Sequence, residues 1–422
     1  MSLAVYVPWL HMHQPLVWFE TNGKKLMSNL EKMLTSKDSR ESWDAKLIAR
    51  AYKNPAKYFK VLKEDGYNPR IILDFSGVLL ESLKELEERK VLERIEVEGE
   101  KVGGIIEAYK DVFKFSGIEI AGSAYSHCYF PATPEEDWGL QIEEWKKTFG
   151  RIFGNKFLKK IKGFWLPELG LPAFEDNVYK LIKVLKENGY EWMILPLQAV
   201  ENYENISYEE RIRIACQPHL LRIKNLSIKV VFRFPSYIID QQAGCSAEEV
   251  YKRALETAKI FREKSEKPAL ILPASDGENG NVMMNEFFPK TFVPFFKEKV
   301  DEKISSLTVS EFLEEYYKKI KSEIKVKFLG ASWINGHRLW LEGSKKLEMA
   351  NKISRISKRF HMIKEKIDEK NLEEVKRFLL IAETSCYVYW GTDFWYEQGE
   401  KALRTVEEKM KNLEKIYKGN KV

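Results

Sequence analysis

Seven short apolar runs, rich in β-branched and aromatic residues, alternate with helix-like segments along the first two thirds of the chain. The helix-like segments include 174–189 and 246–265, and the second opens with Ser246 and Glu249 in capping-box spacing. Because parallel strands need a crossover connection, usually a helix, this alternation predicts an α/β fold with a parallel (β/α)7 barrel. The runs begin near residues 4, 70, 118, 161, 192, 230 and 269.

The pattern changes after about residue 295. Long charged stretches of helical character follow, at 343–369 and 371–389, with a strand-like segment at 326–330 as the main exception. A chain of 422 residues is long enough for a barrel and a second module. We therefore expect a catalytic barrel over 1–295 and a mainly helical C-terminal domain over 296–422, which packs on the barrel and completes the substrate cleft.

Charge and composition narrow the class of partner. The 69 Lys and Arg residues against 63 Asp and Glu residues leave a net charge of +6, with both signs interspersed, so nucleic acid is not an implied partner. The first apolar run has no basic leader and no cleavage site, and no stretch approaches the length that spans a membrane. We predict a cytoplasmic enzyme, and the Lys- and Glu-rich composition resembles that of thermophile proteins. The four cysteines are scattered singly, as expected of reduced thiols: Cys128, Cys216, Cys245 and Cys386.

Histidines and a carboxylate stand at the ends of the first and third runs, where β/α barrels collect their chemistry. Strand alternation turns His11 and His13 to one face, where two imidazoles could bind sugar hydroxyls or hold a metal, unless one is simply structural. The third run supplies Glu119 and then His127. Glu119 lies among apolar residues, so it is either a buried structural partner or a substrate contact.

Two further carboxylates end the fourth and seventh runs. Glu168 follows Trp165 and Pro167, and Asp276 precedes a glycine turn that includes Glu278. Each alone has an ordinary interpretation, as a helix start or a turn. Together, at the ends of two strands of one barrel, they can meet across its mouth, and glycoside chemistry needs one ionised and one protonated carboxyl at a fixed separation.

Tryptophans recur in polar surroundings within the C-terminal part. The segments 332–340 and 389–395 carry four of them, and an indole offers a flat apolar face to a sugar ring and one N–H donor. Some of these side chains are expected to pack between domains. The residues expected to contact substrate here are Trp333, Asn335, Trp340 and Trp390.

These segments, in this order, resemble the motifs of glycoside hydrolase family 57, which includes amylases, 4-α-glucanotransferases, branching enzymes and amylopullulanases. The matching segments are His13-Gln14-Pro15, a looser one from Gly117 to His127, Phe164 to Glu168, Asp276 to Gly280, and Ser332 to Asn335. The resemblance implies that Glu168 is the nucleophile and Asp276 the general acid/base, without metal or cofactor, on an α-glucan substrate. It places His11, His13, Gln14, Glu119, His127, Trp165 and Glu278 around the sugar. The chain departs from the sequence pattern of some relatives at 232–235. Asp240, a few residues further on, is a candidate to replace part of that pattern.

The implied mechanism is a retaining double displacement, for which Asp276 needs a raised pKa. One rival interpretation is a metal-dependent deacetylase or mannosidase with His11 and His13 as ligands, completed by His127 or Asp74. Another is a glucan-binding protein that has kept the fold without catalysis. The sequence leaves open the linkage, the acceptor and the oligomeric state.

Overall fold

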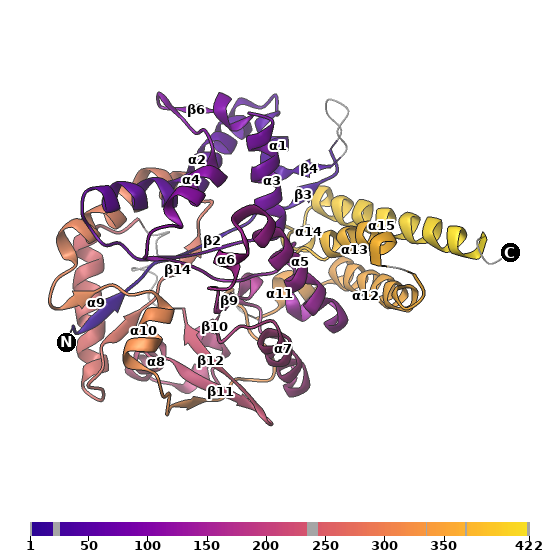
Figure 1. Ribbon diagram of the computed structural model, residues 1–422. Coiled ribbons are helices and arrows are strands. Elements are labelled where there is room, and N and C mark those ends of the chain that lie inside the picture. The colour runs from indigo at the N-terminus through magenta and orange to yellow at the C-terminus, as the bar shows by residue number, and fades with distance from the viewer. Residues whose placement is uncertain (1, 20–25, 234–243, 335, 368, 420–422) are drawn as a thin grey trace.

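The computed structural model describes residues 2–19, 26–233, 244–334, 336–367 and 369–419. Figure 1 shows an α/β body that contains the N-terminal strand, with helices α12 (Ser344–Lys364), α13 (Glu369–Ala382) and α15 (Asp393–Gly419) projecting to one side. Candidate residues Asn335 and Asp240 lie outside the described residues.

The seven predicted runs form neighbouring strands in the order expected of a barrel. Parallel ladders join β14, β2, β5 and β8, an isolated parallel bridge from Gly122 to Phe164 continues to β9, and parallel ladders then join β9, β10 and β12. In the described part of the chain no ladder joins β12 to β14, but the Arg233 side chain donates from Nε to the Ala274 carbonyl at 2.7 Å. The bounds are β1 Ala4–Tyr6, β2 Trp9–Met12, β5 Ile71–Phe75, β8 Ile118–Ile120, β9 Gly163–Trp165, β10 Trp192–Leu195, β12 Leu226–Phe232, β13 Ala269–Ile271 and β14 Ala274–Asp276.

Helices connect these strands, which confirms the predicted α/β class. The predicted segments 174–189 and 246–265 form α7 (Glu175–Glu187) and α9 (Ala247–Arg262), and the capping box of Ser246 and Glu249 is present. The sequence analysis missed one strand. This strand, β11 (His219–Ile223), pairs antiparallel with β12 and forms a hairpin. The other long helices of the α/β body are α2 Ser39–Glu64, α3 Gly77–Glu88, α4 Ile105–Val112 and α5 Glu135–Phe153.

A cluster of buried apolar side chains fills the space enclosed by the strands. Every one of the seven runs except the third contributes a strand residue, and the third contributes Ala121 just beyond β8. Trp9 and Trp165 pack there with ring centroids 5.3 Å apart, and α10 (Val309–Tyr316) adds Val309 and Phe312 from one end. Burial of such aromatic and aliphatic side chains contributes about 1.5–3 kcal/mol each. The enclosed core fixes the strand ends that carry the polar residues.

The C-terminal helical region is confirmed, with α13 packed against both α15 and α12 (Figure 1). The boundary at residue 295 stays a prediction, and the chain returns to the strand layer beyond it, because β15 (Ile304–Ser305) pairs with β1. The predicted strand at 326–330 is wrong, since Val326 makes one isolated bridge, to Val200. The helices are α11 Arg338–Leu341, α12 Ser344–Lys364, α13 Glu369–Ala382, α14 Cys386–Tyr389 and α15 Asp393–Gly419.

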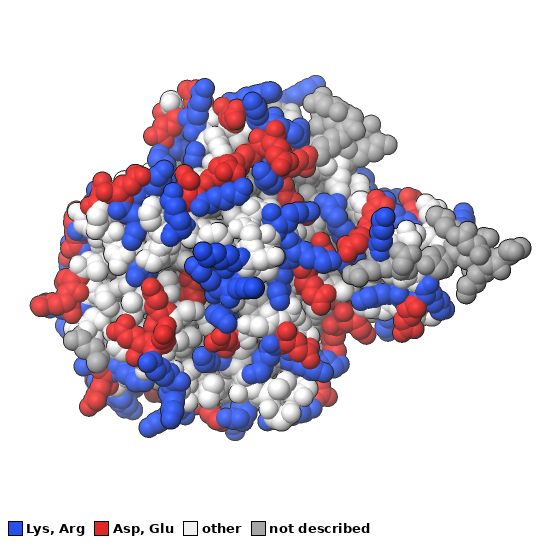
Figure 2. Space-filling view, in the orientation of Figure 1, with Lys and Arg blue, Asp and Glu red and all other residues white. Residues whose placement is uncertain are grey.

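Acidic and basic side chains are interspersed over the face seen in Figure 2, in keeping with the alternating charges of the sequence. Among the described helices, none combines the length and the apolar character needed to cross a membrane.

Candidate active site

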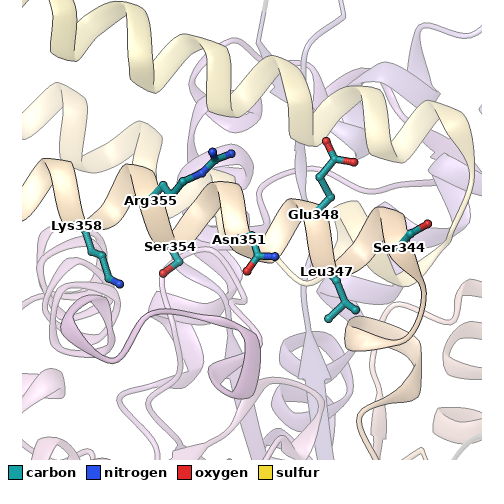
Figure 3. A pocket seen from close by; sticks show the side chains of 7 residues that line it. All are labelled: Ser344, Leu347, Glu348, Asn351, Ser354, Arg355 and Lys358. Atoms are coloured by element: carbon teal, nitrogen blue, oxygen red, sulfur yellow. The ribbon is translucent and has the colours of Figure 1, made fainter.

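A cavity of about 460 Å³ lies where the strands end and the C-terminal helices begin. Both candidate catalytic carboxylates face it. The residues that line it are His11, His13, Gln14, Pro15, Asn29, Met33, Ile48, His127, Glu168, Asp276, Glu278, Asn279, Trp333, Ile334, Cys386, Tyr389, Trp390 and Trp395. A second hollow of about 630 Å³ runs along α12, and Figure 3 shows Leu347, Ser354 and Lys358 directed to one side of that helix. The concentration of buried titratable groups marks the first cavity as the candidate active site.

Glu168 is held at the mouth of β9 by a strained backbone and two donors. Its φ of 60° lies in the left-handed region, which a non-glycine residue seldom adopts. Trp333 Nε1 donates to its Oε2 at 2.9 Å, and Ser385 Oγ donates to its Oε1 at 3.3 Å. Burial, and then the charge of Asp276, raise the pKa of Glu168 to about 7 despite these donors.

Asp276 ends β14 in register with His11 of β2. Two residues further on, Glu278 also reaches the cavity, and its buried Oε2 has no hydrogen-bond partner among the described residues. Burial, and then the charge of Asp276, hold the pKa of Glu278 well above its usual range. Three carboxyl groups therefore share one water-poor space, which disfavours ionising all of them together.

His11 supplies the compensating positive charge. Its Nδ1 donates to Asp74 Oδ1 at 2.6 Å, and Trp9 Nε1 donates to Asp74 Oδ2 at 2.7 Å. Burial alone would lower the pKa of His11, but Asp74, Glu278 and Asp276 together raise it to about 9. We infer that His11 is an imidazolium at neutral pH, held by a fully buried aspartate.

The three predicted histidines form a stack of rings that begins on Trp165. His11 lies 4.9 Å from the Trp165 ring centroid at 11°, His127 lies 4.7 Å from His11, and His13 lies 4.3 Å from His127 at 10°. Burial, and then the neighbouring imidazoles, hold the pKa values of His13 and His127 well below the usual range. In the described part of the chain, the buried Nε2 atoms of these two rings have no partner, so they are free to bind polar atoms of a ligand.

The metal-dependent alternative can be tested on this geometry. His13, His127 and Cys386 offer ligand atoms that all lie within 4.8 Å of one another. The rings of His13 and His127 stack at 10°, so their in-plane lone pairs lie in two nearly parallel planes and do not meet at one point. His11 is occupied by Asp74, and a protonated imidazole cannot ligate. The arrangement does not fit a metal ion unless the rings rotate.

Three candidates do not reach the cavity. Glu119 stands in register with Ile72, and Ile72 stands in register with Trp9, two residues before His11. Its carboxylate therefore lies below the strand ends that carry His11 and Asp276. There it accepts hydrogen bonds from the backbone N–H and the hydroxyl of Ser310. Trp165 is fully buried under His11. Trp340 is buried against Tyr129, with ring centroids 4.2 Å apart. The structure therefore places these three side chains away from the cavity lining, and their contact with a sugar stays a prediction.

Several residues that shape the site were not predicted from the sequence. Asp74 had been considered as a metal ligand and instead binds His11. Arg233, from the segment that departs from relatives, lies 5.4 Å from the Trp333 ring and supports it. Ser385 and Cys386 come from the C-terminal helices, and no local pattern marks them. The remaining unpredicted side chains along the wall include Asn29, Met33 and Ile48.

The parallel strand order and the carboxylate-lined cavity define an α/β protein with a candidate active site at the ends of its strands. The family model for glycosyl hydrolase family 57 matches residues 7–327, which is most of the chain. The chain belongs to glycosyl hydrolase family 57. No curated protein matches it in sequence.

Solved structures match over nearly the whole chain. A family 57 branching enzyme from Pyrococcus horikoshii has a TM-score of 0.66 at 17% identity, covering 96% of this chain and 88% of its own. The α-amylase AmyC from Thermotoga maritima has a TM-score of 0.64 at 14% identity, covering 98% and 94%. A 4-α-glucanotransferase from Thermococcus litoralis has a TM-score of 0.62 at 16% identity, and this chain, of which 97% is covered, spans 59% of it. At these identities the likeness establishes the fold.

Proposed function

We propose that this protein is a retaining enzyme that cleaves or transfers α-glucan chains, with Glu168 as nucleophile and Asp276 as general acid/base. The observation that carries the proposal is that these two carboxylates, from the ends of β9 and β14, line one cavity. Family membership supports the reaction class. The α-glucan substrate is supported by solved relatives that are named as a branching enzyme, a glucanotransferase and an amylase.

In the first step Glu168 attacks the anomeric carbon while Asp276 gives its proton to the departing glycosidic oxygen. Once Glu168 is ionised, its negative charge favours keeping the proton on Asp276, because two like charges in a buried site repel. The donors Trp333 Nε1 and Ser385 Oγ hold the attacking carboxylate in place. A covalent glycosyl-enzyme results.

In the second step Asp276 takes a proton from the acceptor, which attacks the same carbon and restores the α-configuration. Water as acceptor gives hydrolysis, and a sugar hydroxyl gives chain transfer. His11 carries a positive charge beside the carboxylates, which offsets the negative charge that Asp276 gains as it gives up its proton in the first step. Trp390, which is 57% exposed, and Trp395 offer ring faces at the cavity wall for further sugar units.

Product analysis tests this proposal. Maltoheptaose and amylose would be incubated with the protein, and the products followed by chromatography and proton NMR, with Glu168→Gln as control. A ladder of longer and shorter chains or new branch linkages identifies transfer, and shortening with new reducing ends identifies hydrolysis. Products that persist with Glu168→Gln would refute the nucleophile assignment, and glucan binding without turnover in the wild type would favour the non-catalytic alternative.

A chelator separates the proposal from the metal-dependent alternative. Activity on maltoheptaose should survive dialysis against EDTA, because His13 and His127 are not directed at a common point. Activity that is lost with EDTA and restored by Zn²⁺ would overturn the proposed mechanism.

The four cysteines are free thiols, which supports the predicted cytoplasmic location.

A further inference from the structure

Ser385 joins the C-terminal helices to both His127 and Glu168. Its Oγ lies 2.8 Å from His127 Nδ1 and 3.3 Å from Glu168 Oε1, and its backbone N–H donates to the His127 carbonyl at 3.0 Å. The side chain is buried, with 2% exposure. A single hydroxyl group therefore stands between a histidine and the carboxylate that attacks.

Counting protons fixes the direction of these hydrogen bonds. A serine hydroxyl has one proton, and an ionised carboxylate only accepts. When Glu168 is ionised, the Ser385 hydroxyl donates to Oε1, so its oxygen must accept from a protonated His127 Nδ1. In a neutral imidazole the other nitrogen is then unprotonated, which makes His127 Nε2 a hydrogen-bond acceptor.

Protonation of Glu168 reverses the arrangement. A protonated Oε1 donates to Ser385 Oγ, the serine hydroxyl turns to donate to His127 Nδ1, and the histidine proton moves to Nε2. The net change is one proton taken up by the carboxyl group, together with one proton relocated on the ring through exchange with water in the cavity. His127 Nε2 is then a donor.

We propose that Ser385 is a positioning residue that couples the protonation of Glu168 to the tautomer of His127, so that His127 Nε2 accepts a hydrogen bond from a substrate hydroxyl only while the nucleophile is ionised. The unpartnered Nε2 atom, buried beside the cavity, is the atom through which this coupling reaches a ligand. The selection of a hydroxyl donor rests on the proposed function, whereas the coupling rests on the three side chains alone.

Several other titratable groups face these side chains. His11 and His13 stack on and beside the His127 ring, and Cys386 lies within 4.8 Å of His13 and His127. Asp276 and His11 act on Glu168. The pKa of His11 is about 9, burial holds that of His13 well below its usual range, and burial raises that of the Cys386 thiol. Glu168, whose pKa is about 7, is the carboxyl group bound to Ser385, so a change near pH 7 in the His127 tautomer that disappears in Glu168→Gln reports Glu168.

Nitrogen NMR of the full-length protein tests the coupling directly. Protein labelled with ¹⁵N in histidine would be recorded from pH 5.5 to 8.5, with His127 assigned by the signal lost in His127→Asn. We expect His127 Nε2 to pass from protonated to unprotonated as the pH rises through about 7. Ser385→Ala should abolish this change, and Ser385→Thr, which keeps a hydroxyl, should retain it.

A matched control is Ser357→Ala, which removes another buried serine hydroxyl, one without a partner in the described part of the chain. It should leave the His127 transition intact. One tautomer throughout this pH range in the wild type, or a transition that survives in Ser385→Ala, would overturn the proposal. If Ser385→Ala does not fold, Glu168→Gln serves instead, because a transition that persists without the carboxyl group overturns it equally. The samples contain no sugar, so failure of the α-glucan proposal would leave this result unaffected.

Discussion

Replacing Trp333 by phenylalanine should move the acidic limb of the pH profile, because this indole holds the ionised form of Glu168. Its Nε1 donates to Glu168 Oε2 at 2.9 Å, and Glu168 is only 8% exposed. A hydrogen bond to a charged group contributes about 1.5–3 kcal/mol. Trp333 is partly exposed, so we take the lower end, which corresponds to a rise of about 1 pH unit in the pKa of Glu168.

The wild-type kcat/KM should fall tenfold per pH unit below about 7, the pKa of Glu168. In Trp333→Phe this limb should move to about pH 8, so that the variant is roughly tenfold less active than the wild type at pH 6 and close to it near pH 9. The assay is the pH dependence of kcat/KM on a chromogenic maltooligosaccharide. Trp390→Phe is the control, because that ring stacks beside Trp395 in the same cavity, at 6.5 Å between centroids. An unshifted limb in Trp333→Phe would refute the reasoning.

Three further predictions concern stability. Glu168→Gln should stabilise the fold by about 3 kcal/mol above pH 7 and by little at pH 4. The pKa of Glu168 is about 7 in the folded protein and 4.5 in the unfolded chain, so the wild type loses stability as the pH rises from 4.5 to 7. Equal melting temperatures of the two proteins at pH 8 would contradict this. Gly163→Ala should destabilise by about 1–3 kcal/mol or more, because the new Cβ would lie 2.2 Å from Trp192, while Gly139→Ala on α5, with open space around it, should be neutral or stabilising in urea unfolding. Glu119→Ala should cost about 1–3 kcal/mol, because the N–H and hydroxyl of Ser310 lose their acceptor, and should leave kcat unchanged; a large loss of kcat would return Glu119 to the active site.

The sequence was sufficient to predict which residues stand at the ends of the strands. Parallel strands in one sheet end at a common rim, so Glu168, Asp276, His11 and His13 could be expected to converge without knowledge of their distances. The depth of a residue on its strand could not be obtained in this way. Glu119 stands in register with Ile72 rather than with the rim, and this register depends on how the strands pair.

Contacts between distant segments were equally out of reach. Ser385 lies 217 residues from Glu168 along the chain, in the turn just before α14, and no local motif marks it. The indole of Trp333 was expected to stack on sugar, but it also donates to the nucleophile. Such roles depend on side-chain directions that local periodicity does not determine. The strained backbone at Glu168 belongs to the same group, because φ of a glutamate cannot be read from its neighbours.

The central claim, that Glu168 and Asp276 perform a double displacement, is tested most directly by azide rescue with an aryl α-maltoside. In Glu168→Ala, azide should occupy the space of the lost carboxylate and displace the aryl group once, which gives a β-glycosyl azide. In Asp276→Ala the glycosyl-enzyme still forms with the activated leaving group, and azide should then attack from the opposite face, which gives an α-glycosyl azide. Proton NMR of the anomeric centre distinguishes the two products. Products of these two configurations support the account, and exchanged configurations, or no azide product from either variant, would contradict it.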